Sequence, residues 1–132
     1  MKVKYINTVQ IAALLIFTLL LNCRRIVEPV TFGEYFVTNS TTKTLLINAV
    51  RIGGTEAILL ANSISAGEKE HIFSFAEGSG GAVVPSNAFS SFIVYSENKS
   101  PTNIIYSKVE NSDWIYEGLD REGHLVYHLI IK

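Results

Sequence analysis

The sequence predicts an all-β protein, an antiparallel β-sandwich that follows an N-terminal signal segment. From about residue 32 onward, β-branched and aromatic residues recur with a period of two, which is the pattern of half-buried strands. Turns rich in glycine and serine separate these segments at intervals of about ten residues. The same region has no segment with the 3.6-residue period of an amphipathic helix. A small β-barrel is the alternative architecture for this pattern.

About eight short strands are expected, over residues 34–39, 43–52, 56–64, 69–76, 88–96, 103–108, 113–119 and 124–132. One face of the second strand is expected to hold Leu45, Ile47 and Ala49. One face of the fifth is expected to hold Phe89, Ser91, Ile93 and Tyr95. The last hairpin turns at residues 120–123, where glycine is suited to a positive φ. Strands of this number and spacing are typical of an immunoglobulin-like sandwich or a related topology.

Length and charge limit the possible classes of protein. The chain has 132 residues, enough for one domain, and its 48% hydrophobic and 17% charged residues exclude a disordered polar chain. Once the signal segment with Lys2 and Lys4 is removed, nine basic residues remain against 12 acidic ones. A nucleic-acid surface would need clustered lysine and arginine, so no nucleic-acid partner is expected.

The first 22 residues have the layout of a secretory signal. Residues 1–4 are short and positively charged, and residues 5–21 are mostly apolar, most densely over 11–21. This dense block is shorter than the roughly 20 residues that cross a bilayer. We therefore expect a signal peptide over 1–22, a modified cysteine and tether over 23–31, and the β-sandwich over 32–132. A membrane anchor that is not cleaved is the alternative.

The end of this segment resembles a bacterial lipobox, in the relaxed form found in spirochaetal lipoproteins. The residues that carry the resemblance are Leu20, Leu21, Asn22 and Cys23. Leucine three places before the cysteine fits the usual pattern, whereas Asn22 stands where glycine, alanine or serine is common. The resemblance implies cleavage before Cys23 and attachment of lipid to its thiol. A weaker resemblance, of architecture only, is to small uncharacterised β-sandwich lipoproteins of Gram-negative and spirochaetal bacteria.

Physical chemistry agrees with a lipid anchor at Cys23. It is the only cysteine, so no intramolecular disulfide is possible. A buried CH₂ group contributes about 0.8 kcal/mol, and two acyl chains hold a protein stably on a membrane where one holds it marginally.

Arg24 and Arg25 would lie near anionic headgroups, or in a solvated tether. Because Arg24 replaces the aspartate that retains lipoproteins in the inner membrane of enteric-type bacteria, the expected location is the outer membrane. An incidental cysteine is the alternative.

No metal or cofactor is expected from the histidines. His124 and His128 are four residues apart in an expected strand, which places them about 13 Å apart on one face, too far to share a metal ion. His71 follows Glu70 directly in another strand, so these two side chains point to opposite faces. Solvated or edge-strand positions are the expectation for all three histidines.

No catalytic residue is expected either. Ser79 lies among glycines at 78–81, but no helix and no Lys-Ser/Thr pair follows, so neither a nucleophile elbow nor a phosphate loop is indicated. Four carboxylates near the last hairpin have the distribution of a solvated turn rather than of a glycosidase pair. These are Asp113, Glu117, Asp120 and Glu122.

The sequence therefore favours a lipid-anchored module of the cell envelope that binds a ligand and is not an enzyme. The ligand would be another envelope protein, a polysaccharide or a host molecule. The loops Glu77–Asn87 and Glu97–Thr102 are the expected places for recognition. An envelope hydrolase and a structural component without a ligand are the alternatives. A cleft of polar residues would favour the hydrolase, and an exposed aromatic patch would favour binding.

The anchor is tested by the intact mass of the protein extracted from membranes with detergent. We expect the mass of residues 23–132 plus two or three acyl chains, and Cys23→Ser should abolish both the acyl mass and membrane retention. An unmodified chain of 132 residues would instead establish an uncleaved anchor, and a cleaved chain without lipid would establish a free exported domain.

Overall fold

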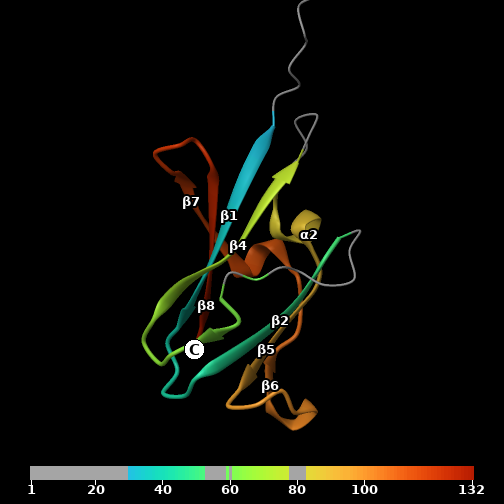
Figure 1. The fold of residues 1–132 in the computed structure, drawn as a ribbon, viewed down its shortest axis with the longest axis vertical. Helices are drawn as coiled ribbons and strands as arrows, with labels where there is room; N and C mark the ends of the chain where they lie inside the picture. Colours follow the sequence, from blue (N-terminus) through green and yellow to red (C-terminus); the bar gives the residue numbers. More distant parts are fainter. Residues whose placement is uncertain (1–29, 53–58, 60, 78–82) are drawn as a thin grey trace, which may run out of the picture.

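The computed structural model describes residues 30–52, 59, 61–77 and 83–132, which form a sandwich of two β-sheets (Figure 1). Sheet A has the strand order β4-β1-β8-β7, and sheet B has the order β3-β2-β5-β6. The predicted β-sandwich of eight strands is thereby confirmed. The described strands form two separate sheets, so the barrel is not the architecture adopted.

The strands are short and the helices are single turns. Sheet A contains β1 (Thr31–Asn39), β4 (Lys69–Glu77), β7 (Trp114–Leu119) and β8 (Leu125–Ile131). Sheet B contains β2 (Leu45–Arg51), β3 (Ser63–Ile64), β5 (Phe89–Ser96) and β6 (Ile104–Tyr106). Connections between strands contain α2 (Pro85–Ala88), η1 (Pro101–Asn103) and η2 (Asn111–Asp113). In the described residues no helix has the length and apolar character needed to cross a membrane.

Several predicted segments differ from the structure in extent. β1 begins at Thr31, three residues before the expected start. Of the strand expected over 56–64, residues 56–58 and 60 lie outside the described residues, and of its remainder only Ser63–Ile64 is a strand. The loop expected over 77–87 contains the start of α2, because proline is suited to the first turn of a helix.

One pair of neighbouring strands is parallel. β1 runs antiparallel to β4 but parallel to β8, with Gly33 opposite Leu125 and Asn39 opposite Ile131. Parallel neighbours cannot be joined by a tight turn, so the chain between them must cross over. Here that crossover includes all of sheet B, and β8 fills the place between the first strand and β7.

The core forms between the inner faces of the sheets, around the buried Tyr35. This ring lies 5.1 Å from Phe89 and 5.8 Å from Trp114, both edge to face, and 5.7 Å from Tyr127 in a stacked arrangement. The Tyr35 hydroxyl donates a hydrogen bond to the Val83 carbonyl. Burial raises the pKa of Tyr35 well above its ordinary value, so the hydroxyl stays protonated.

β-Bulges decide which side chains reach this core. In β5 the partner of Arg51 is Phe89 and the partner of Val50 is Ser91, so Ser90 is an extra residue. The bulge reverses the alternation at this point, and Phe89 therefore faces inward, like Phe92. The prediction that Phe89 shares a face with Ser91 is wrong for this reason. The predicted alternation of β2 is confirmed, because its buried residues are Leu45, Ile47 and Ala49.

The opposite end of β1 is held by a buried polar side chain, Asn39, whose exposed fraction is 0%. Its amide group donates to the carbonyls of Lys43 at 2.7 Å and Ile64 at 2.9 Å. Its side-chain oxygen accepts from the backbone N–H of Thr41 at 3.0 Å and from the Thr41 hydroxyl at 2.7 Å. All of its hydrogen-bonding capacity is used, and it connects sheet A to the first turn and to β3 of sheet B.

Replacing Asn39 by alanine should therefore lower the free energy of unfolding by about 2 kcal/mol, because buried carbonyls and a turn lose their partners. Urea denaturation followed by circular dichroism measures the effect. Asn48→Ala, at an exposed position of β2, is the control and should change stability by less than about 0.5 kcal/mol. Equal effects of the two substitutions would contradict a structural role for the Asn39 amide.

Candidate functional site

The outer face of sheet A brings together all three histidines of the chain. Tyr35 and Val37 of β1 are buried, so the alternate residues Phe32, Glu34 and Phe36, followed by Thr38, point away from the core. Each of these outward side chains contacts a histidine. Phe32 lies against His124, and Glu34 lies between His71 and His124. Phe36 stacks on His71, and Thr38 is hydrogen-bonded to His128. β1 is therefore the element that organises this face.

We call this surface the histidine face. It comprises outward side chains of four strands and of the last turn: Phe32, Glu34, Phe36, Thr38, Lys69, His71, Ser74, Ile115, Glu117, Asp120, His124, His128 and Ile130.

A β-bulge in β4 makes the central cluster possible. Tyr35 pairs with Phe73 and Phe36 pairs with His71, so one extra residue, Ile72, lies between the two pairs. Both Ile72 and Phe73 are buried. Side chains three apart on a regular strand face opposite ways, but this bulge places His71 and Ser74 on the same outward face.

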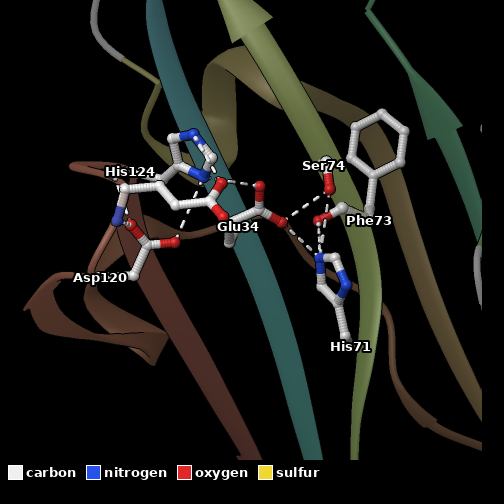
Figure 2. A network of polar contacts seen from close by, with 7 residues as sticks. Glu34, His71, Phe73, Ser74, Asp120 and His124 are labelled. Carbon is white, nitrogen blue, oxygen red and sulfur yellow. Dashed lines mark hydrogen bonds and ion pairs between the residues drawn. The ribbon is translucent and has the colours of Figure 1, made fainter.

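Glu34 is the centre of the cluster (Figure 2). One of its oxygens, Oε2, lies 2.5 Å from His71 Nε2 and accepts a hydrogen bond of 2.6 Å from the Ser74 hydroxyl. The other, Oε1, lies 3.3 Å from His124 Nδ1. The Glu34 side chain is only 14% exposed, so this carboxylate is held between two imidazoles in a largely desolvated position.

Hydrogen-bond chemistry fixes the proton of His71. Its Nε2 lies 3.2 Å from the Phe73 carbonyl oxygen as well as 2.5 Å from the Glu34 carboxylate. Carbonyl and carboxylate oxygens only accept, so Nε2 must be the protonated nitrogen. Ser74 lies 3.2 Å from the same nitrogen, but it directs its own proton to Glu34. His71 therefore has no free lone pair facing Ser74.

The last turn positions His124. Asp120 Oδ1 accepts hydrogen bonds from the backbone N–H groups of His124 at 2.9 Å and Glu122 at 2.8 Å, and Oδ2 lies 3.2 Å from His124 Nδ1. The backbone N–H groups, that of His124 foremost, hold the pKa of Asp120 below its usual range. The predicted turn at 120–123 is confirmed, and Gly123 adopts a φ of 86°.

A second polar group lies further along the face. Lys69 of β4 donates to Glu117 of β7 at 3.0 Å, while His128 Nδ1 lies 2.8 Å from Glu117 and His128 Nε2 lies 2.6 Å from the Thr38 hydroxyl. Burial opposes the charge on Glu117, but hydrogen bonds and charge from Lys69 and His128 hold its pKa below the usual value. Glu117 is an extra residue in β7, between the pairs Tyr116–Tyr127 and Gly118–Val126.

Aromatic and aliphatic side chains flank the polar groups. The Phe36 ring stacks on His71 at 4.8 Å and lies 5.1 Å from Lys69 Nζ, and the Phe32 ring lies 5.0 Å from His124. Three large apolar side chains of this face are exposed to solvent: Phe32 at 41%, Ile115 at 51% and Ile130 at 36%. The face thus combines fixed charges with accessible apolar surface.

Of the four carboxylates considered from the sequence, Glu117 and Asp120 lie on the histidine face, Glu122 lies 3.8 Å from His124 Nε2, and Asp113 lies apart. Asp113 accepts from the Tyr106 hydroxyl and pairs with Lys108, whereas Glu117 belongs to the Lys69 group. The loops at 77–87 and 97–102 begin at opposite ends of the sandwich, since β4 ends beside the start of β1 and β5 ends beside the start of β2. Cys23 and Ser79 lie outside the described residues.

The sequence did not indicate the Glu34 cluster. It predicted correctly that Glu70 and His71 point to opposite faces, as their partners Val37 and Phe36 show. In the part of the chain that the structure describes, no group of three or more histidine, cysteine, aspartate or glutamate residues could hold a metal ion. In the alternation of β1, Glu34 shares a face with Phe32 and Phe36, two positions before and after it. This pattern is the signal that could have indicated a polar group on the outer face.

Comparisons of the chain with protein-family models, curated proteins and solved structures give no match.

The charge on Glu117 predicts part of the acid sensitivity of the fold. Because its pKa is lower in the folded chain than the ordinary value of about 4.3, its contribution is complete above that pH and is lost as the pH falls through the folded value. Urea unfolding at about pH 7 and about pH 3 should show a smaller acid loss for Glu117→Gln than for the unmodified protein.

Glu110→Gln is the matched control. The Glu110 carboxylate lies 4.0 Å from Lys108 and its side chain is 59% exposed, so this substitution should leave the acid loss unchanged. An identical acid loss for Glu117→Gln and the unmodified protein would show that the Lys69–Glu117–His128 group does not act on stability.

Proposed function

We propose that this protein is a lipoprotein of the cell envelope, anchored through Cys23, whose β-sandwich binds another macromolecule through the histidine face. The signal segment and the lipobox resemblance support the anchor. The observation that carries the binding role is an exposed apolar surface, formed by Ile115 and Ile130, which lies beside a fixed row of polar side chains. The residue after Cys23 supports the outer membrane as the location, which is part of the same proposal.

The polar part of this face is already ordered without a ligand. Glu34 is held from both sides by histidines, and Glu117 is held by Lys69 and His128. A partner therefore meets side chains whose conformations are fixed, and association need not order them. The apolar side chains beside this row would be removed from water when a partner binds, and this removal contributes favourable free energy to association.

A protein of the envelope is the ligand class that fits this face best. Small molecules bind in concave sites, whereas the histidine face is the outer surface of a sheet. Interfaces between proteins combine aromatic and aliphatic contacts with hydrogen-bonded polar groups in the way these strands present them. A polysaccharide and a host molecule are the other outcomes that the experiment below can return.

The Ser74, His71 and Glu34 cluster is the one observation that favours the alternative of an envelope hydrolase. A serine nucleophile needs a base with a free lone pair, and the base is then oriented through its second nitrogen. In this cluster the Ser74 hydroxyl and the Glu34 carboxylate both lie beside the same nitrogen, His71 Nε2. That nitrogen donates a hydrogen bond, so it cannot act as the base for Ser74. Binding is therefore the better supported function.

Photo-crosslinking in intact cells tests the binding role. A photoreactive amino acid placed at position 115, on the histidine face, should give a defined higher-mass adduct, and mass spectrometry of that adduct identifies the partner. The matched position is 48, which is also exposed but lies on the outer face of sheet B. It should give no such adduct.

Adducts of equal yield from both positions would indicate collision rather than a binding face. Absence of any adduct at 115, in cells where the protein is shown to be anchored and folded, would remove the support for a binding module and favour a structural component.

A further inference from the structure

We propose that the end of the sandwich at which β1 begins rests directly on the lipid bilayer, with Phe32 and Leu119 in its interfacial region. This inference rests on the proposed anchor at Cys23. It goes beyond the anchor because it assigns a lipid-contacting surface to the folded domain itself.

The strand register defines this end, which we call the proximal end. Thr31 pairs with Glu77 at the end of β4, and Gly33 pairs with Leu125 at the start of β8. Leu125 in turn pairs with Leu119 at the end of β7. The start of β1, the end of β4 and the last turn therefore lie together at one end of sheet A (Figure 1).

Sheet B contributes to the same end. β2 ends at Arg51, opposite the first residue of β5, and the backbone N–H of Ile52 donates to the Ala88 carbonyl at 3.1 Å. Asn39, Lys69 and the last strand residue, Ile131, mark the opposite, distal end.

Covalent geometry brings the proximal end near the anchor. Thr31 follows Cys23 by eight positions, and eight extended residues span at most about 29 Å. A strand of nine residues such as β1 is itself about 30 Å long, so the distal end lies a further domain length away. The tether limits the distance from the membrane but does not by itself bring the domain into contact.

Exposed apolar side chains supply the contact. Leu119 is 65% exposed, the largest value among the exposed large hydrophobic residues of the described chain, and Val30, Phe32 and Ile52 are 50%, 41% and 44% exposed. All four belong to the proximal end. Phe32 on β1 and Leu119 at the end of β7 lie on the two sides of β8, at the same end of sheet A. An aromatic and an aliphatic side chain at such positions suit the boundary between headgroups and acyl chains.

Charge decides the kind of lipid surface. Glu34, Glu77, Asp120 and Glu122 lie at this end, against the basic residues Arg51 and Arg121 and the imidazole of His124. Carboxylates outnumber the fixed positive charges, so anionic headgroups are not attracted to this surface. The expected surface is a zwitterionic bilayer, and added salt should not release the domain from it.

Depth measurements on the full mature lipoprotein test the proposal. The thiol of Cys23 is occupied by lipid, so a cysteine introduced elsewhere can be spin-labelled alone. One variant carries Arg121→Cys in the last turn, and a matched variant carries Lys99→Cys in the exposed turn after β5 at the distal end. Each is reconstituted into phosphatidylcholine vesicles, and collision rates of the nitroxide with oxygen and with a water-soluble nickel chelate give its depth.

The label at 121 should lie at headgroup depth, with higher oxygen and lower nickel collision rates than the label at 99. Adding Phe32→Ser and Leu119→Ser should move the label at 121 into water. Ile104→Ser with Ile105→Ser removes exposed apolar side chains from β6 instead, where they are 39% and 45% exposed, and should leave the depth unchanged.

Two results overturn the inference. Labels at 121 and 99 with equal, fully aqueous collision rates, on a protein whose mass shows acyl chains, would overturn the docking surface and leave the anchor intact. A protein that takes up a second label at Cys23 and does not float with the vesicles would overturn the anchor and the docking surface together.

Discussion

The fold depends on the position of β1 between two neighbours, with its two faces serving different purposes. Its inward side chains place Tyr35 at the centre of the aromatic core, and the hydroxyl of that residue reaches the Val83 carbonyl. A buried hydroxyl without an acceptor would cost more than the bond itself contributes, so this contact also fixes where the chain before α2 must pass. Gly33 permits the approach, since a Cβ there would lie 3.0 Å from the Tyr35 hydroxyl and 3.1 Å from Val83.

Local patterns were enough to predict the class of fold and much of its detail. A period of two identified the strands, and the chemistry of aspartate and glycine identified the last turn, because both depend on residues close in sequence. Strand pairing joins residues that are distant in sequence, so the sequence pattern did not indicate that β1 and β8 are parallel neighbours. Bulges are also invisible to periodicity, since Ile72 and Ser90 differ in no way from ordinary strand residues until their partners are known.

The candidate site was harder to predict than the fold for the same reason. His71 and Ser74 have a spacing that places them on opposite faces of a regular strand, and only the bulge brings both to Glu34. Glu117 faces His128 after a comparable irregularity in β7. The residues at Cys23 that resemble a lipobox are contiguous and could be seen directly, whereas the histidine face is assembled from four strands that are distant in sequence. A surface of that kind becomes visible only with the tertiary structure.

The parallel pairing of β1 with β8 also determines when the domain can fold. Gly33 pairs with Leu125, which lies 92 positions later in the chain, and β7 joins sheet A only through β8. During synthesis the first strand therefore lacks one of its two neighbours until almost the whole chain has left the ribosome, and contacts so remote in sequence form slowly. For a chain exported as its first 22 residues predict, this delay is useful. A secretion channel threads unfolded polypeptide, and a domain whose closing strand is made last reaches the channel before it can become compact.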